Sequence, residues 1–260
     1  MIHNMLIVLG VIFFLQLIFF IYAVINKTDK VTDLSYGLTF VIASILSYSL
    51  VYQYSSIFKL LLVLLVVVWG LRLAIFLFVR VVRTKKDKRF DGIREKPLKF
   101  ASFWLLQAIS VFVILLPTTY TLLLNRDTSL GWFSYIGLLI AILGIAIESI
   151  ADVQKFVFKN VAENKNRWIS TGLWKYSRHP NYLGEILMWV GVYIYVLPYL
   201  NDFSLLTIVS PIYISVLLLF VSGIPKLEKE YKERYKGNSE YDKYVRSTGR
   251  LLPKIFLKND

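Results

Sequence analysis

The residues best suited to chemistry stand at the predicted start of an apolar helix. Pro180 favours the first turn of such a helix, where free backbone N–H groups can hold an anion. One polar residue is enough to cap a helix, so five of them within eight positions indicate a ligand site rather than a basic loop that ends in an ordinary cap. The five are Arg178, His179, Asn181, Tyr182 and Glu185.

Basic residues also stand inside and just beyond the third predicted membrane helix. Arg72 lies about 10 Å inside the end of that helix, given the helical rise per residue, and an arginine at such a depth usually serves a function. Arg80 and Arg83 fall on the same side of the helix. The three guanidiniums could form a phosphate-binding ladder, because the arginine fork matches phosphate oxygens. Alternatively, Arg80 and Arg83 anchor to lipid headgroups while Arg72 snorkels.

A mixed-charge stripe lies at the end of the fifth predicted helix and is formed by Glu148, Asp152, Lys155 and Lys159. A salt-bridged helix at the membrane surface would account for this pattern. Glu148, however, follows an apolar run, where a carboxylate is costly unless it has a buried partner from protein or ligand. The sequence leaves both interpretations open.

The composition predicts a membrane protein. The chain has 260 residues, of which 57% are hydrophobic, and several apolar runs are long enough to cross a bilayer. We therefore expect an all-α, polytopic integral membrane protein with one domain over residues 1–260. About seven transmembrane helices are predicted, near residues 5–25, 34–52, 57–79, 100–124, 132–150, 182–198 and 205–221.

The distribution of charge predicts the topology. Three segments, 80–99, 151–181 and 224–260, hold 25 of the 30 Lys and Arg residues behind the net charge of +13. An odd number of spans places these segments on one side, which the positive-inside rule assigns to the cytosol. The N-terminus is then outside and the C-terminus cytosolic, so the basic excess reflects topology and predicts no nucleic-acid partner. With no cysteine and two histidines, no metal site is predicted.

The second predicted span is unusually polar. It carries Asp33, Ser35, Tyr36, Gly37 and several further Ser and Tyr residues. We expect a span of this kind to face protein or a cavity more than lipid.

The tail, residues 224–260, is predicted to be cytosolic and amphipathic. Leu227, Tyr231 and Tyr235 recur at four-residue spacing, which indicates a helix with an apolar and aromatic stripe. This helix could lie flat on the membrane surface. Alternatively, the tail closes over the helix ends as a lid that includes Tyr241, Tyr244, Arg246 and Arg250.

The sequence from Arg178 to Glu185 is similar to a motif of membrane reductases. The chain resembles the DUF1295 group of bacterial membrane proteins, which in turn looks like the steroid 5-alpha-reductase C-terminal family. Sterol reductases carry a similar Arg-His-x-Asn-Tyr-x-Gly-acid sequence, and steroid 5-alpha-reductases retain its Asn, Gly and Glu. The resemblance covers most of the chain, with further similarity at residues 33–37, 69–72, 148–152, 171–177 and 227–253.

This resemblance implies a seven-span fold in which NADPH enters from the cytosol and lies mainly among residues 68–260. Asn181 and Glu185 would contact the nicotinamide, and Arg72 would contact a phosphate. Together with the patterns above, the predicted cofactor-binding set also includes Arg80, Arg83, Glu148, Asp152, Lys159, Arg167, Tyr176, Arg178, His179, Tyr182 and Arg250.

The third span departs from the reductase pattern. Trp69 stands where the reductases place a catalytic tyrosine, and Asp33 corresponds to a glutamate of their second span. Trp69 has no hydroxyl proton to give, so a proton donor is expected on the second span. Asp33 and Tyr36 are the predicted catalytic residues, with Tyr48 as a further source of the proton.

Three functions follow from these patterns. The first is NADPH-dependent reduction of an activated carbon–carbon double bond in a lipid-soluble, steroid-like or isoprenoid-like substrate, in the bacterial inner membrane and in contact with its lipids. The second is S-adenosylmethionine-dependent methyl transfer, because isoprenylcysteine carboxyl methyltransferases share a motif that residues 172–184 fit loosely. The third is a non-catalytic, lipid-binding protein. The pair of Asn181 with Glu185 and the number of arginines favour the reductase, because NADPH carries three phosphates.

Overall fold

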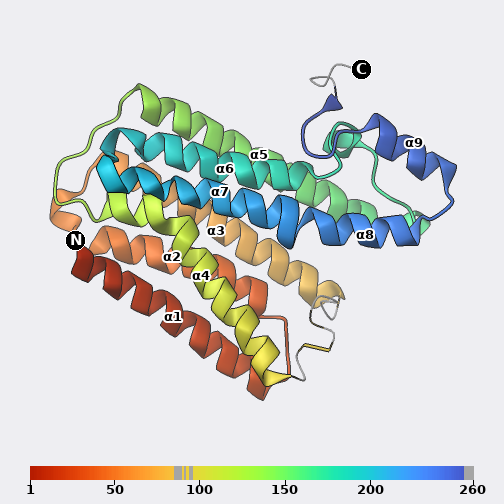
Figure 1. The fold of residues 1–260 in the computed structure, drawn as a ribbon, viewed down its shortest axis with the longest axis horizontal. Helices are drawn as coiled ribbons and strands as arrows, with labels where there is room; N and C mark the ends of the chain where they lie inside the picture. The colour runs from red at the N-terminus through yellow and green to blue at the C-terminus, as the bar shows by residue number, and fades with distance from the viewer. Residues whose placement is uncertain (85–89, 91, 94–95, 255–260) are drawn as a thin grey trace. The chain divides into compact units, whose positions relative to one another are not determined.

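The computed structural model describes residues 1–84, 90, 92–93 and 96–254, and the described chain is helical (Figure 1). No β-strand occurs in these residues; Ser177 and Gly249 form an isolated β-bridge. The prediction of an all-α protein is therefore confirmed. The α-helices are α1 (Ile2–Ile25), α2 (Thr32–Ser49), α3 (Ile57–Thr84), α4 (Pro97–Leu122), α5 (Trp132–Asn160), α6 (Pro180–Val196), α7 (Val209–Val216), α8 (Ile224–Arg234) and α9 (Ser239–Ser247).

Six of the predicted spans form helical segments that are long and apolar enough to cross a membrane. Within the described residues these segments run over Ile2–Ile25, Ile57–Arg83, Pro97–Leu122, Trp132–Asn160, Pro180–Tyr199 and Asp202–Arg234. The second predicted span is the helix α2, whose 18 residues include several Ser and Thr and which is not among the six. The chain is an integral membrane protein, and its orientation across the bilayer stays a prediction.

The chain divides into two compact units. The first comprises residues 1–137 and 192–210, and the second comprises residues 138–191 and 211–260. The single domain over residues 1–260 stays a prediction.

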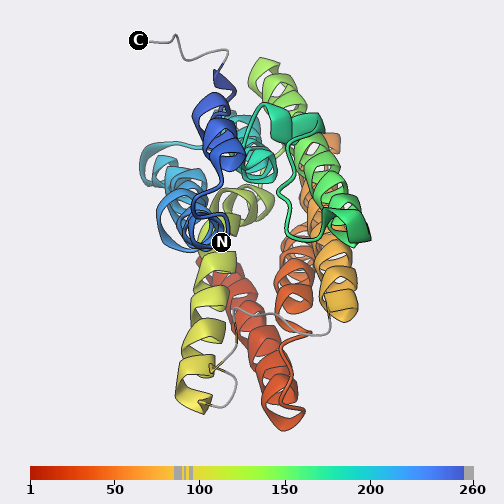
Figure 2. The ribbon, with the colours of Figure 1, turned by 90° about the vertical axis from the view of Figure 1, so that its right-hand side faces the viewer.

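Polar side chains are buried inside the first unit, where α2 packs against α1, α3 and α4. Figure 2 shows α1 and α4 side by side. The Gln107 amide donates to Gln16 Oε1 at 2.8 Å and to Ser35 Oγ at 3.0 Å, and the Gln16 amide donates to Thr39 Oγ1 at 2.8 Å. The polar character of α2 is thus directed toward neighbouring helices, as the sequence predicted. Hydrogen bonds of this kind hold transmembrane helices together.

Glycine residues allow the backbones of α2 and α3 to come into direct contact. A Cβ atom on Gly37 would lie 2.6 Å from the carbonyl oxygen of Gly70, and one on Gly70 would lie 3.0 Å from that of Gly37. Small residues at such crossings let membrane helices pack closely.

The second unit contains an equivalent crossing between α5 and α6. A Cβ atom on Gly144 would lie 2.4 Å from the Met188 nitrogen, and one on Gly184 would lie 2.5 Å from the Glu148 nitrogen. This contact fixes α6, with the motif at its start, against the part of α5 that carries Glu148.

The last membrane segment changes its winding before it becomes the predicted amphipathic helix. A π-helical turn covers Leu217–Val221, and the Ser222 nitrogen donates to the Leu217 carbonyl at 2.8 Å. α8 follows over Ile224–Arg234 and carries Leu227 and Tyr231, while Tyr235 directly follows its last residue. The predicted helix is confirmed.

Candidate functional site

Two local contacts shape the start of α6. The backbone nitrogen of His179 donates to Ser177 Oγ at 3.2 Å, and the His179 carbonyl accepts from the Leu183 nitrogen. Pro180 is the first residue of the helix, as predicted. His179 is therefore held in place by its own backbone, and its side chain is buried, with 2% of the residue exposed.

The segment before α6 is docked on α5. The Trp174 indole donates to the Ala151 carbonyl at 3.0 Å, and the Leu173 nitrogen donates to the Gln154 side chain at 3.0 Å. Gly172 has a φ of +60°, and a Cβ atom there would lie 2.4 Å from the Gln154 amide. Glycine is thus favoured at this turn by its conformation, and a Cβ atom would displace the Gln154 side chain that accepts from Leu173.

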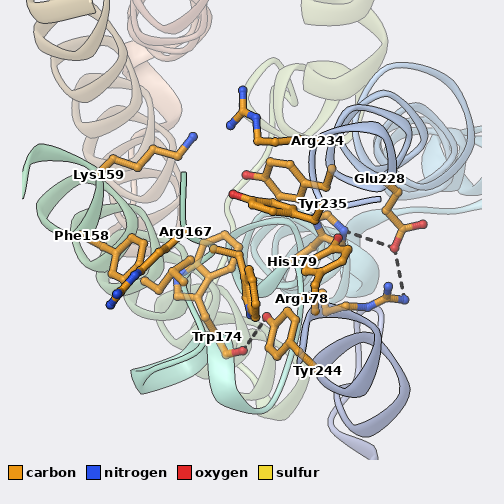
Figure 3. Close-up of a pocket in the computed structure, with 14 residues that line it drawn as sticks. Phe158, Lys159, Arg167, Trp174, Arg178, His179, Glu228, Arg234, Tyr235 and Tyr244 are labelled. Atoms are coloured by element: carbon orange, nitrogen blue, oxygen red, sulfur yellow. Dashed lines mark hydrogen bonds and ion pairs between the residues drawn. The ribbon is translucent and has the colours of Figure 1, made fainter. Parts of the chain in front are cut away.

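A cavity of about 510 Å³, including its opening to solvent, lies within the second unit (Figure 3). Its lining comes from the end of α5, the segment before α6, α8 and α9. The lining residues are Phe158, Lys159, Arg167, Trp168, Ile169, Trp174, Arg178, His179, Glu228, Tyr231, Arg234, Tyr235, Tyr241 and Tyr244.

Aromatic rings form one wall of this cavity. The centroid of the Trp168 ring lies 5.3 Å from that of Tyr235, 5.1 Å from that of Tyr241 and 6.2 Å from that of Tyr244. Tyr235 and Tyr241 are buried, and Trp168 is half-buried. We name these four rings the aromatic wall.

Glu228 connects several basic residues at the cavity. One carboxylate oxygen, Oε1, lies 3.2 Å from the Arg178 guanidinium and 3.5 Å from His179 Nε2, and Oε2 lies 3.2 Å from Arg250 Nε. Figure 3 shows His179 and Arg178 pointing toward Glu228. A carboxylate of α8 thus joins two residues of the α6 motif to the segment after α9.

The segment after α9 is bonded directly to the motif. The Arg178 nitrogen donates to the Gly249 carbonyl at 2.8 Å, and the Tyr244 hydroxyl donates to the Trp174 carbonyl at 2.9 Å. Tyr241 and Tyr244, both on α9, also line the cavity. The tail therefore covers part of the site, which matches the predicted lid in its tyrosines and in Arg250. Arg246 is exposed and does not line the cavity.

Burial shifts the pKa of three side chains that line the cavity. It lowers the pKa of His179 below the ordinary value of 6.5, and the neighbouring Glu228 carboxylate offsets part of this effect. Burial also raises the pKa of Tyr241 to about 12 and raises the pKa of Tyr244 above its ordinary value. At neutral pH the imidazole is therefore neutral and both phenols keep their protons.

Four residues of the predicted set line the cavity: Lys159, Arg167, Arg178 and His179. Arg250 joins them through Glu228, and the Tyr182 ring stacks on the His179 ring at 5.8 Å. Tyr176 is 47% exposed. The other members in this unit are on the two crossing helices, with Glu148 and Asp152 buried on α5, and Asn181 and Glu185 half-buried on α6.

The predicted residues of the first unit form a different arrangement. Asp33 is buried at the start of α2 and accepts from the Arg80 guanidinium at 3.2 Å. Arg80, predicted as a phosphate ligand, thus has a carboxylate partner within its own unit. Arg72 is half-buried, Arg83 is exposed, and the Tyr36 ring packs edge-on against Phe40. Roles for these residues in binding or catalysis stay predictions.

Sequence reasoning missed several residues of the cavity. Glu228, Arg234 and Trp168 line the cavity, but the sequence patterns predict no role for them. The same patterns do predict an aromatic stripe that contains Tyr231 and Tyr235. The four-residue spacing indicated that these tyrosines share a face, but nothing in the sequence indicated that Trp168 lies opposite them.

The family model described as "Protein of unknown function (DUF1295)" matches residues 19–248. The chain belongs to the DUF1295 family. This DUF1295 protein is also 23% identical over 167 residues to an uncharacterized protein of Schizosaccharomyces pombe, and the match covers 57% of the chain and 47% of that relative. The match thus spans about half the length of the relative. No solved structure matches the chain.

Proposed function

We propose that this DUF1295 protein is an NADPH-dependent reductase of an activated carbon–carbon double bond in a lipid-soluble substrate. One observation carries the proposal: a cavity with an aromatic wall and several cations opens beside the start of α6. That helix carries the motif that resembles sterol reductases, so features suited to a nucleotide and the reductase-like motif occur in the same unit.

The lining of the cavity suits part of a nucleotide in its chemistry, because it combines aromatic rings with Lys and Arg side chains. Purine bases stack on aromatic side chains, and guanidiniums bind phosphate oxygens. His179 Nδ1 is buried and has no hydrogen-bond partner within the described residues, so a ligand that supplies one would remove an energetic cost.

Asn181 and Glu185 are proposed to bind the nicotinamide. They lie four residues apart and therefore on one face of α6. A carboxamide offers both a carbonyl acceptor and an NH₂ donor, which an Asn amide and a Glu carboxylate complement. When bound, NADPH supplies the hydride for such a reduction.

The proton for the substrate is proposed to come from α2. Asp33 accepts from Arg80 at 3.2 Å, and a carboxylate held this way is an acceptor rather than a donor. Tyr36 carries a hydroxyl proton on the same helix, one turn away. The ion pair thus favours Tyr36 over Asp33 as the donor.

The location of the protein and the class of its substrate are proposed together. An integral membrane protein with a reductase-like site acts most readily on a substrate dissolved in lipid, and the resemblance to bacterial proteins favours the bacterial plasma membrane, with the C-terminus in the cytosol.

The proposal is tested by ligand binding in mild detergent. NADPH, NADH and S-adenosylmethionine are compared by their effect on the melting temperature, because a ligand that binds only the folded protein stabilises it. We expect NADPH to raise the melting temperature. A rise with S-adenosylmethionine alone would replace the reductase by a methyltransferase, and no rise with any of the three would favour a non-catalytic lipid-binding protein.

A pair of variants ties that binding to the motif. Asn181→Leu and Glu185→Leu should each lower the affinity for NADPH while the protein still folds, because leucine carries no burial penalty in an apolar helix. Ile186→Leu, on the same helix, is the matched control and should bind as the parent does.

A further inference from the structure

Three cations from different elements line the cavity together with the aromatic wall. Lys159 belongs to the last turn of α5, Arg167 to the segment before α6, and Arg234 to the end of α8. All three are exposed, whereas Trp174 and His179 in the same cavity are 2% exposed. These cations therefore form a rim around a buried interior, and we name them the cationic rim.

Carboxylates are scarce at this rim. Glu228 is the one acidic residue among those lining the cavity within the described chain, and its oxygens already contact Arg178, His179 and Arg250. Glu230 binds Arg234 at 2.8 Å but is half exposed and does not line the cavity. Lys159 and Arg167 have no ion-pair partner in the described residues. An anionic ligand would thus find concentrated positive charge here.

The aromatic wall limits the class of anionic ligand that the cavity is expected to bind. Trp168, Tyr235 and Tyr241 lie within 5.3 Å of one another, centroid to centroid. A planar base gains stacking energy on such rings, whereas inorganic phosphate and a lipid headgroup phosphate have no ring to stack. The combination favours a phosphorylated purine nucleoside.

The same arrangement distinguishes NADPH from NADH. Sites that prefer NADH place a carboxylate on the ribose 2′-hydroxyl, whereas an arginine accommodates the 2′-phosphate of NADPH. Lys159, Arg167 and Arg234 line the cavity together with the rings, and its single lining carboxylate is engaged by Arg178 and His179 (Figure 3).

We propose that the cationic rim of Lys159, Arg167 and Arg234 binds the 2′-phosphate of NADPH, with the adenine against the aromatic wall. This inference rests on the proposed function and adds to it the residues that select the cofactor and the end of the cofactor that the cavity holds. Arg234 is the decisive member, because it joins the rim to the helix that carries Tyr231 and Glu228.

The experiment measures the dissociation constants of NADPH and NADH for the detergent-purified protein by quenching of tryptophan fluorescence. Arg234→Gln and Lys159→Gln should each weaken NADPH binding about tenfold or more, because each removes a charge-assisted contact. NADH binding should change less than about twofold, since NADH offers no 2′-phosphate. Arg234→Lys should recover part of the loss, and Lys232→Gln, exposed on the same helix and outside the cavity, is the control.

Competition between NADPH and adenosine monophosphates identifies which phosphate group the cationic rim binds. Adenosine 2′-monophosphate should displace NADPH from the parent much better than adenosine 5′-monophosphate does, and Arg234→Gln should abolish the difference. Equal weakening of NADPH and NADH in the rim variants would overturn the inference, as would unchanged NADPH affinity combined with lost binding to vesicles that contain phosphatidic acid. A parent that binds neither nicotinamide nucleotide would instead overturn the proposed function. Unliganded melting temperatures equal to that of the parent show that the variants fold.

Discussion

Each compact unit contains a pair of helices that cross at two glycines, yet the two units use their polar side chains differently. At the Gly37–Gly70 crossing of the first unit, the buried amides and hydroxyls nearby bond to one another, as Gln16 and Gln107 do. Beside the Gly144–Gly184 crossing of the second unit, Arg178 and His179 of the motif line a cavity that is open to solvent.

The difference separates polar side chains that stabilise helix packing from polar side chains that are available to a ligand. Buried polar groups that find partners within the helices stabilise packing. Charged groups that gather around a cavity with a single lining carboxylate are better explained by a ligand, because that carboxylate already contacts Arg178 and does not balance the further charge of Lys159 and Arg167. The comparison predicts that stability and ligand binding respond differently to changes in the two units.

The largest effects are expected at the glycine crossings. Gly144→Ala places a Cβ atom 2.4 Å from backbone, and Gly37→Ala places one 2.6 Å from backbone. Each should destabilise the protein by about 3 kcal/mol, because neither backbone can move aside cheaply. Unfolding in mixed micelles measures this, with Gly10→Ala as the control, since nothing lies within 4 Å of that position. Gly144→Ala should also weaken NADPH binding by the protein that remains folded, whereas Gly37→Ala should not, and an equal binding defect in the two folded variants would contradict the comparison.

Removal of the central amide of the first unit should lower stability alone. Gln107→Leu leaves Gln16 Oε1 and the Ser35 hydroxyl without this donor, which we expect to cost about 2 kcal/mol of unfolding free energy. Binding of NADPH by the folded protein should be unchanged. A binding defect with normal stability would show that the polar groups of the first unit serve a ligand instead.

Loss of the Glu228 charge should affect ligand binding more than stability, which is the opposite of the result expected for Gln107→Leu. Glu228→Gln weakens the contacts to Arg178 and Arg250, so these residues would be less well positioned. We expect NADPH affinity to fall about tenfold, equivalent to about 1.4 kcal/mol, with a smaller change in unfolding free energy. Glu233→Gln, an exposed change on the same helix, is the control. If Glu228→Gln lowered stability without affecting binding, Glu228 would be a structural residue.

The smallest effect concerns pH. Because burial lowers the pKa of His179 in the folded protein, the unfolded chain binds more protons at acidic pH. His179 therefore costs no stability above pH 6.5, and stability falls as the pH drops below 6.5 toward the folded pKa. The groups that act on His179 are Glu228, Arg178 and Lys155. His179→Gln should reduce the loss of melting temperature between pH 6.5 and about pH 5, and an identical pH profile would refute this assignment.

Local patterns in the sequence were sufficient to predict the main elements of the fold. Runs of apolar residues predicted α1, α3, α4, α5 and α6, because length and hydrophobicity are properties of contiguous residues. The four-residue spacing of Leu227 and Tyr231 predicted α8 for the same reason. The cluster of polar residues after Ser177 predicted that the start of α6 matters, and it lies at the cavity.

Patterns of contiguous residues did not predict which residues, distant in the sequence, contact each other in the folded protein. Glu228 contacts residues about 50 positions earlier in the chain, and Asp33 pairs with Arg80 across two helices. Each pairing depends on how helices cross, and the crossings depend on glycines whose role becomes visible only when two backbones meet. Contiguous patterns in the sequence are enough to establish an all-α membrane protein. The tertiary structure decided which charges neutralise one another and which gather around a cavity, because electrostatic energy depends on distance in space rather than on separation along the chain.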